Sequence, residues 1–296
     1  MKKIIEKLKN GEVLISDGAW GTFLQEEGLA QGECPELWNI ENRDVVLRIA
    51  KSYIDAGSDM IETNSFGGNK IKLDHFDLGD RTYELNKAAA EISREAAGEE
   101  KIVLGSIGPT GKILMMGDIS EEELYNAFAI QAKGLADGGA DAICIETFFD
   151  IDEAKIAIKA VKENTDLEIM MTFSFDKAPD GSFNTMMGIS PKQMTESLIE
   201  EGIDVIGTNC SNGFEGMIGI VKEIRDSNSE IPILVHANAG MPVIKDDEVS
   251  YPDTPIIMAD LTPSLLKAGA NIVGGCCGTT PEHIKLIKEA VINFKK

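Results

Sequence analysis

The stretch Ala268-Gly269-Ala270-Asn271-Ile272-Val273 decides the fold, because three earlier segments of the chain repeat its pattern. They are Ala56-Gly57-Ser58-Asp59-Met60-Ile61, Gly138-Gly139-Ala140-Asp141-Ala142-Ile143 and Glu201-Gly202-Ile203-Asp204-Val205-Ile206. Each segment reads as a helix that ends at a glycine, then a short polar turn, then a buried strand. We therefore expect four helix-to-strand units of the same construction, leading into strands two, four, six and eight.

Outward from these repeats, short apolar runs alternate with longer amphipathic stretches along the chain. The predicted strands are Val13–Asp17, Met60–Asn64, Ile102–Ile107, Ala142–Thr147, Glu168–Phe175, Val205–Cys210, Pro232–Asn238 and Ile272–Cys276. The helical patterns between them include Glu121–Asp137, Ile151–Glu163, Pro191–Glu201, Phe214–Arg225 and Pro281–Phe294. Eight strands, each followed by a helix, predict an α/β fold of the (β/α)8 type, the TIM barrel. We expect residues 1–296 to form one domain, with longer loops at Gly67–Asp80 and Asp176–Gly188.

Polar residues and thiols stand at matching positions after each repeat. Seven residues after the aligned glycine the chain has Asn64, Glu146, Asn209 and Cys276, and eight residues after it Ser65, Thr147, Cys210 and Cys277. These positions mark the C-terminal ends of alternate strands, which is where catalytic groups lie in a TIM barrel. Core packing alone would favour Val, Ile or Leu there, so the pattern indicates a functional rim.

Three of these residues, Cys210, Cys276 and Cys277, form the strongest candidate site. Three soft ligands without a fourth are typical of a zinc site that keeps one coordination position open. The flanking glycines allow neighbouring side chains to bend toward one metal ion. Two other interpretations remain: Gly274 and Gly275 could form a phosphate-binding turn, and the cysteines could be ordinary buried small residues.

Carboxylates and histidines give weaker signals. Asp17 ends the first predicted strand, where it could cap a helix or contact a substrate. Glu146 has apolar neighbours and would be costly to bury without a cationic partner, a role that the ammonium group of an amino acid could fill. We expect His75 and His283 to lie at the surface and His236 to be a hydrogen-bonded core residue.

Composition narrows the class of protein. The chain has 296 residues, 43% of them hydrophobic, and a formal net charge of −22. So acidic a protein is not expected to bind nucleic acid or an anionic membrane. Five cysteines without the spacing of a small secreted domain do not indicate a disulfide framework. The first residues lack the apolar run of a signal peptide, and no segment is long enough to span a membrane. We therefore expect a soluble, cytoplasmic protein.

With these residues assembled, the chain resembles the zinc-dependent homocysteine S-methyltransferase family over nearly its whole length. The motifs that carry the resemblance are Asp17-Gly18-Ala19, Glu62-Thr63-Asn64-Ser65-Phe66-Gly67-Gly68-Asn69, Gly105-Ser106-Ile107-Gly108-Pro109-Thr110-Gly111, Ile145-Glu146-Thr147, Thr208-Asn209-Cys210, Asn238-Ala239-Gly240-Met241-Pro242 and Gly274-Gly275-Cys276-Cys277-Gly278. Within that family it is most similar to the N-terminal homocysteine-binding modules of cobalamin-dependent methionine synthase. Trp20 departs from the family pattern, which commonly has methionine there.

The resemblance implies a methyl transfer to the thiol of homocysteine, giving methionine. Cys210, Cys276 and Cys277 would hold Zn²⁺ and carry the catalysis. The residues implied to bind the substrate are Asp17, Ala19, Trp20, Asn64, Glu146 and Asn238, with Glu146 and Asp17 at the ammonium group and backbone amides around Ala19 and Trp20 at the carboxylate.

The methyl donor is expected to come from outside the chain, because no glycine-rich dinucleotide loop is present and no folate-binding or cobalamin-binding module is expected. The resemblance favours methylcobalamin or another methylated corrinoid on a separate protein that docks on the C-terminal face of the barrel. The two longer loops are the expected docking surface. Three alternatives stay open: a sulfonium donor such as S-methylmethionine, another thiol acceptor, and a non-enzymatic zinc- or thiol-binding subunit that scaffolds a corrinoid protein.

Overall fold

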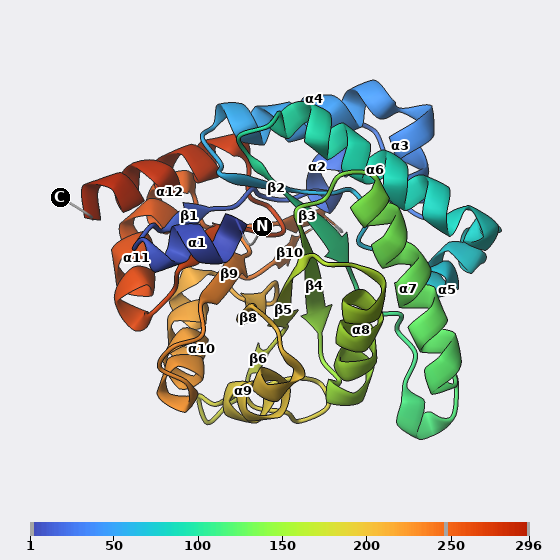
Figure 1. Cartoon of the computed structure of the whole chain (residues 1–296). Helices are drawn as coiled ribbons and strands as arrows, with labels where there is room; N and C mark the ends of the chain where they lie inside the picture. Colours follow the sequence, from blue (N-terminus) through green and yellow to red (C-terminus); the bar gives the residue numbers. More distant parts are fainter. Residues whose placement is uncertain (1–2, 246–247, 295–296) are drawn as a thin grey trace.

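Eight parallel strands form one sheet at the centre of the protein (Figure 1). This computed structural model describes residues 3–245 and 248–294. The strands are β1 (Leu14–Ile15), β2 (Met60–Glu62), β3 (Ile102–Ile107), β4 (Ala142–Phe148), β5 (Glu168–Phe173), β8 (Val205–Asn209), β9 (Ile233–Ala237) and β12 (Ile272–Gly275). Their order is β1-β12-β9-β8-β5-β4-β3-β2, and every pair in it is parallel. The predicted α/β (β/α)8 barrel is confirmed, with all eight expected strands.

The repeated sequence pattern has a physical cause at the start of every second strand. In the last repeat, Asn271 donates its N–H to the carbonyl of Ile233 at 2.9 Å and accepts the N–H of the same residue on its side-chain oxygen at 2.9 Å. The aspartates of the other repeats make the same two bonds, Asp59 with Ile15, Asp141 with Val103 and Asp204 with Ile169. A short side chain with an acceptor oxygen is therefore needed at this position.

Two aspartates also close the barrel. The strands β1 and β2 stand at the two ends of the sheet order and must meet to close the barrel. At the amino end of β2, Asp59 joins them through its two bonds with Ile15 of β1. At the carboxyl end of β2, the carboxylate of Asp17 accepts the N–H of Glu62 at 2.9 Å. The carboxylates thus satisfy backbone groups that a regular strand pair would satisfy by itself.

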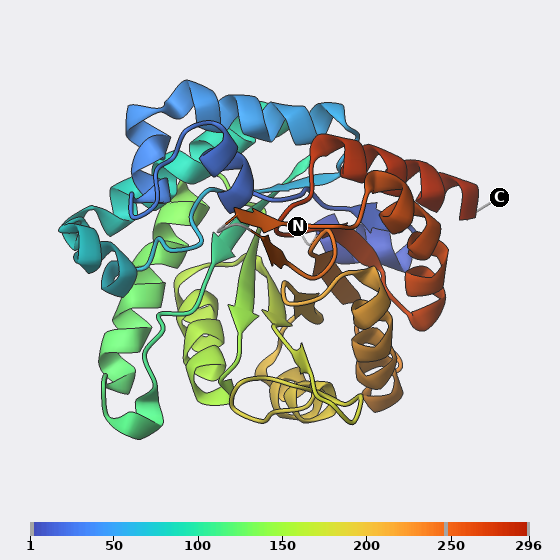
Figure 2. The ribbon, with the colours of Figure 1, turned by 180° about the vertical axis from the view of Figure 1, so that it is seen from behind.

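Helices surround the strands in both views of the molecule (Figures 1 and 2). The long ones are α4 (Arg43–Asp55), α6 (Thr82–Ala97), α7 (Glu121–Asp137), α8 (Ile151–Asn164), α9 (Pro191–Leu198), α10 (Phe214–Ser227), α11 (Pro255–Ala268) and α12 (Pro281–Phe294). Helix α1 (Lys3–Lys9) covers the amino end of the barrel, where Glu168 accepts the N–H groups of Ile4 and Ile5. Within the described residues, no helix is both long and apolar enough to cross a membrane.

The barrel interior is apolar at its amino end and polar at its carboxyl end. An inner cluster of buried side chains, separate from the larger core between strands and helices, includes Met60, Leu104, Cys144, Met170 and Leu234. Because side chains alternate along a strand, the residues two positions further on also face inward. They are Glu62, Ser106, Glu146, Thr172 and His236, and all five are buried.

Several expectations about loops and histidines need correction. Residues 67–80 are not a plain loop, since they contain α5 (Lys70–Leu73), a 3-10 turn (Asp74–Phe76) and the start of a second one (Gly79–Arg81). Residues 176–188 contain a hairpin, β6 (Asp176–Lys177) with β7 (Phe183–Asn184), and a second hairpin, β10 (Val243–Lys245) with β11 (Glu248–Ser250), follows β9. His75 is exposed as expected. The surface position predicted for His283 is wrong, because this side chain is 5% exposed and hydrogen bonds Thr280 and the carbonyl of Asp253.

Candidate active site

Three thiols meet at the carboxyl end of the barrel. The Sγ atoms of Cys210, Cys276 and Cys277 all lie within 4.8 Å of one another, and those of Cys276 and Cys277 are 4.0 Å apart. Strand β9 lies between β8 and β12 and holds the ends of both strands in place. The backbone carbonyl of His236 accepts the N–H of Cys210, and the backbone carbonyl of Ala237 accepts the N–H of Cys276. The site predicted from the sequence is therefore assembled by the ends of three adjacent strands.

The backbone around the thiols is shaped to bring them together. Cys210 has a left-handed conformation, with φ at 59°, as does the next residue, Ser211, with φ at 56°. A non-glycine residue in this region is strained, and such residues concentrate at functional sites. On the other side, Gly278 turns the chain with φ at 78° directly after Cys277. A turn on each side of the site directs side chains from β8 and β12 to one point.

The donor set fits a zinc ion. Two sulfur atoms bound tetrahedrally at about 2.3 Å from zinc lie roughly 3.8 Å apart, close to the 4.0 Å between Cys276 and Cys277. All three thiols are half-buried and free of disulfide bonds. Three thiolates leave one position of a tetrahedron for a further ligand, as in zinc sites that bind substrates.

A cavity of about 530 Å³ opens beside the thiols. The thiols form one wall of it, and Glu62, Glu146 and His236 line it as well. Three aromatic residues, Trp20, Phe66 and Phe76, also line the cavity. A ligand that fills it therefore meets soft sulfur atoms, buried carboxylates and aromatic rings.

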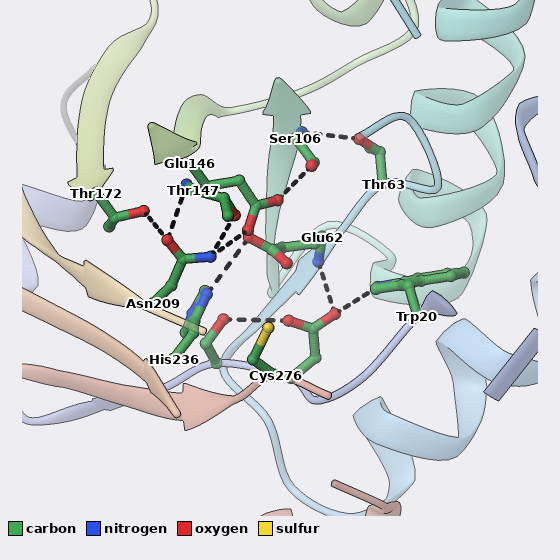
Figure 3. Close-up of polar contacts among 12 residues, drawn as sticks. Trp20, Glu62, Thr63, Ser106, Glu146, Thr147, Thr172, Asn209, His236 and Cys276 are labelled. Atoms are coloured by element: carbon green, nitrogen blue, oxygen red, sulfur yellow. Dashed lines mark hydrogen bonds and ion pairs between the residues drawn. The ribbon is translucent and has the colours of Figure 1, made fainter. Parts of the chain in front are cut away.

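Glu146 is held in a fixed orientation within the cavity wall (Figure 3). Ser106 donates its hydroxyl to Oε1, and Asn209 donates its amide to Oε2 at 3.2 Å. Burial raises the pKa of this carboxyl to about 7, since the charged form loses its hydration. Asn209 also donates to the hydroxyl of Thr147 and accepts the N–H of Thr147 and the hydroxyl of Thr172. Asn209, which directly precedes Cys210, thus connects β4, β5 and β8.

Glu62 and His236 are the site residues that the sequence analysis missed or undervalued. Glu62 ends β2 and is 7% exposed, and its Oε1 has no hydrogen-bond partner among the described residues. His236 is buried as predicted, but neither ring nitrogen makes a hydrogen bond within the described structure. Its Nδ1 lies 3.5 Å from Glu62 Oε1. One ligand atom each from Glu62, Glu146 and His236 lie within 4.8 Å of one another, so this group could also hold a metal ion.

The remaining predicted residues occupy three different settings. Asp17 is fully buried below the cavity, where it accepts the indole N–H of Trp20 at 2.9 Å and the N–H of Glu62. Burial raises the pKa of Asp17 to about 6. Asn64 lines the cavity but uses both amide hydrogens on Pro35 and Asn39. Asp17 therefore contacts two residues that line the cavity without lining it itself, and Asn64 has only its side-chain oxygen to offer.

Two further residues are placed less favourably for a ligand. The N–H of Ala19 is donated to Thr279 at 3.0 Å, which leaves the N–H of Trp20 as the amide of this pair without a partner in the described structure. Asn238 is buried at 2% exposure and does not line the cavity. Trp20 lines the cavity, and the buried side-chain oxygen of Asn238 has no hydrogen-bond partner within the described structure.

The fold and site define the class of protein: a (β/α)8 barrel with thiols and carboxylates at the carboxyl ends of its strands, where the active sites of such barrels lie. The model of the homocysteine S-methyltransferase family matches residues 14–291. The chain belongs to this family, which confirms the resemblance found in the sequence.

Individual relatives agree with this assignment. The chain is 33% identical to the methionine synthase of Mycobacterium tuberculosis and 32% identical to that of Mycobacterium leprae, over 96% and 94% of its own length. It spans only 25% and 24% of those relatives. Among solved structures, the metallated homocysteine methyltransferase MmuM of Escherichia coli superposes with a TM-score of 0.78 at 21% identity, covering 96% of this chain and 98% of that one. This last likeness is one of fold.

Proposed function

We propose that this protein transfers a methyl group to the thiol of homocysteine, giving methionine, with a zinc ion held by Cys210, Cys276 and Cys277. One observation carries the proposal: three thiols within 4.8 Å of one another share a cavity with buried carboxylates. Homocysteine has a thiol and an ammonium group a few bonds apart, so one molecule can satisfy both walls. The family to which the chain belongs supports this acceptor.

Zinc, when bound, would supply the ionisation of the substrate thiol, worth about 2 kcal/mol at neutral pH relative to a free thiol with a pKa of about 8.5. The protein's own contribution is to orient the acceptor. We propose that Glu146 accepts the ammonium group, since Ser106 and Asn209 already hold its carboxylate. Asn209 is adjacent to Cys210, so the thiol and ammonium ends of the substrate are positioned by one connected segment.

We propose that the carboxylate of homocysteine is received by the N–H of Trp20. Asp17 would support this contact, because it holds the indole ring of Trp20 by a hydrogen bond of 2.9 Å. Asn64 would contribute its side-chain oxygen at the cavity wall, and the buried floor would exclude water from the sulfur atom. Ala19 would contribute its backbone shape, since its N–H is already engaged by Thr279.

For the methyl donor, we propose a methylated corrinoid on a partner protein that covers the cavity mouth. The curated relatives are methionine synthases of which this chain spans about a quarter, which supports a donor bound elsewhere. Exposed apolar side chains are available for such a contact, Met186 at 71% exposure, Met241 at 56% and Ile244 at 74%. They lie on the two hairpin segments that follow β5 and β9.

A sulfonium donor is the second candidate, and one observation favours it. The cavity is lined by Trp20 and Phe66, and aromatic faces attract cations by about 0.5–2 kcal/mol. A sulfonium such as S-methylmethionine is both cationic and a methyl donor. It would need no partner protein.

The experiment supplies zinc-loaded protein with homocysteine and either methylcobalamin or S-methylmethionine, and measures methionine by mass spectrometry. The proposal expects zinc-dependent methionine formation that is lost in Cys210→Ala. Methionine formation from S-methylmethionine but not from methylcobalamin would show that the donor is a sulfonium and not a corrinoid. Stoichiometric zinc with no methionine from either donor would refute the enzymatic proposal and favour a scaffold subunit.

We also propose that residues 1–296 act as one homocysteine-binding domain in the cytoplasm. All five cysteines are free, and the three at the site must remain reduced to bind a metal ion. A reducing compartment such as the cytoplasm maintains thiols in this state.

A further inference from the structure

The cavity contains a buried carboxylate to which no role has been assigned. Glu62 is 7% exposed and lines the cavity. It lies two residues after Met60, a member of the inner barrel cluster, so its side chain points into the barrel interior. Oε1 has no hydrogen-bond partner in the described part of the chain. A carboxylate oxygen in this position is available to a ligand.

Titratable groups face Glu62 from the end of β1 and from β4 and β9. Asp17 accepts the backbone N–H of Glu62 from the end of β1, and His236 on β9 lies 3.5 Å from Oε1. Glu146 and Cys144 approach from β4, with ligand atoms of Glu62, Glu146 and His236 within 4.8 Å of one another. Figure 3 shows Glu62 beside Glu146, with the ring of His236 directed toward them.

The cluster carries acidic groups without a compensating cation. Among the described residues, no lysine or arginine forms an ion pair with Asp17, Glu62 or Glu146. Burial lowers the pKa of His236 to about 4, so the imidazole is neutral at neutral pH. Burial and the neighbouring carboxylates of Glu146 and Asp17 raise the pKa of Glu62 well above its usual value. Lys72 also lines the cavity, but its positive charge acts on Glu36, where it opposes the rise in pKa that burial causes. Within the cluster of Asp17, Glu62 and Glu146, negative charge is therefore balanced by protons.

We propose that Glu62 is a third carboxylate of the ammonium subsite and that it releases a proton when the ammonium group of the substrate binds. The inference rests on the proposed function, since it takes homocysteine as the ligand. The O–H bond of the Glu62 carboxyl breaks, its proton passes to solvent, and the carboxylate pairs with an ammonium group that keeps its three hydrogens. His236 acts as a positioning residue that stays neutral beside Glu62.

This exchange makes the pocket selective for amino thiols. A thiol without an ammonium group cannot replace the lost proton by a positive charge, so it binds a pocket that stays protonated. A charge-assisted hydrogen bond contributes about 1.5–3 kcal/mol, which corresponds to at least roughly tenfold in affinity. Below the pH at which Glu62 ionises in the free pocket, homocysteine should bind more tightly as the pH rises, because proton release is then coupled to binding.

Titration calorimetry of the zinc-loaded protein tests the inference with two ligands, homocysteine and 4-mercaptobutanoate, which is the same molecule without its amino group. Each titration is run in two buffers of different ionisation enthalpy, which counts the protons released. Both ligands release a thiol proton, so the difference between them reports the carboxyl groups. We expect homocysteine to release up to about one more proton and to bind at least roughly tenfold more tightly.

Glu62→Gln should remove most of the extra proton and reduce the preference for homocysteine roughly tenfold, with zinc still bound at one ion per chain. The matched control is Glu153→Gln, a carboxyl that is 1% exposed, accepts two bonds from Thr110 and lies outside the cavity. The control should behave as the parent.

Equal proton release by the two ligands in the parent protein would overturn the inference without any variant. An unchanged preference for homocysteine in Glu62→Gln would also overturn it. So would a second zinc ion per chain that is lost in Glu62→Gln, because Glu62 would then be a metal ligand. In each of these cases zinc-dependent methionine formation can persist, which separates failure of this inference from failure of the proposed function.

Discussion

Glu146→Gln is the most informative substitution at the acceptor site, because the structure predicts a loss of ligand affinity without a loss of structure. The two bonds to the carboxylate come from the hydroxyl of Ser106 and the amide of Asn209. A glutamine can keep its oxygen toward Asn209 and turn its amide toward the Ser106 oxygen, which can accept. The variant should therefore fold, since both neighbours of the carboxylate can still hydrogen bond the amide.

The expected magnitude follows from the charge that is lost. A hydrogen bond between an ammonium group and a carboxylate contributes about 1.5–3 kcal/mol. The affinity for homocysteine should therefore fall by roughly 10- to 100-fold. Because Glu62 remains within 4.8 Å, the ammonium group keeps one carboxylate, and binding should not be abolished. Zinc content should stay at that of the parent, since the three thiols are unchanged.

Isothermal titration of zinc-loaded protein with homocysteine, together with metal analysis of the same samples, measures both quantities. Glu153→Gln again serves as the control for removing a buried carboxylate. Equal homocysteine affinity in Glu146→Gln and the parent would refute the assignment of the ammonium group to Glu146. Loss of zinc in Glu146→Gln would show that the carboxylate supports the metal site instead.

Three further expectations concern the metal, the pH dependence of stability and the amino end of the barrel. Cys210→Ala should lose both zinc and methyl transfer, as should the parent after chelation, whereas Cys34→Ala should keep zinc by metal analysis; retained metal and activity in Cys210→Ala would contradict the proposed mechanism. Burial raises the pKa of Asp17 to about 6 and that of Glu146 to about 7, whereas it lowers the pKa of His236 to about 4. The protons that the two carboxyl groups keep in the folded metal-free protein outnumber the single imidazole proton that it lacks between about pH 4 and 7, so its free energy of unfolding should fall as pH rises through that window. Urea unfolding at about pH 5 and 7.5 measures this, and a fall no smaller in Glu146→Gln would exclude this cause. Glu168→Ala removes the acceptor of two N–H groups at the start of α1 and should lower the free energy of unfolding by about 2–3 kcal/mol; an unchanged urea midpoint would show that α1 does not depend on this contact.

Much of the fold was predictable because its signals are local. A helix that stops at a glycine, a polar turn and an apolar strand follow one another within about ten residues, and the spacing repeats. The aspartate or asparagine of each repeat had no explanation in the sequence. The structure gives it one, since Asn271 and its counterparts each bond both backbone groups of one residue on the preceding strand.

The site was predictable in part. The three thiols and Glu146 stood out because polar residues at strand ends break the pattern of a buried strand. Glu62 had the same signal, as it follows Met60 by the two-residue period of inward-facing positions, but the alignment by glycines drew attention to Asn64 instead. Applying the period of each strand, rather than the distance from a glycine, would have identified Glu62.

The sequence by itself determined the order of strands and helices, the barrel type and the thiols at its rim, because hydrophobic period and turn residues act over short stretches of chain. The tertiary structure alone decided which of the polar residues meet. In the sheet order, β2 and β9 are separated by β1 and β12, and β4 and β9 by β5 and β8. Glu62, Glu146 and His236 therefore approach one another only across the interior of the closed barrel, and no local spacing in the sequence encodes that distance.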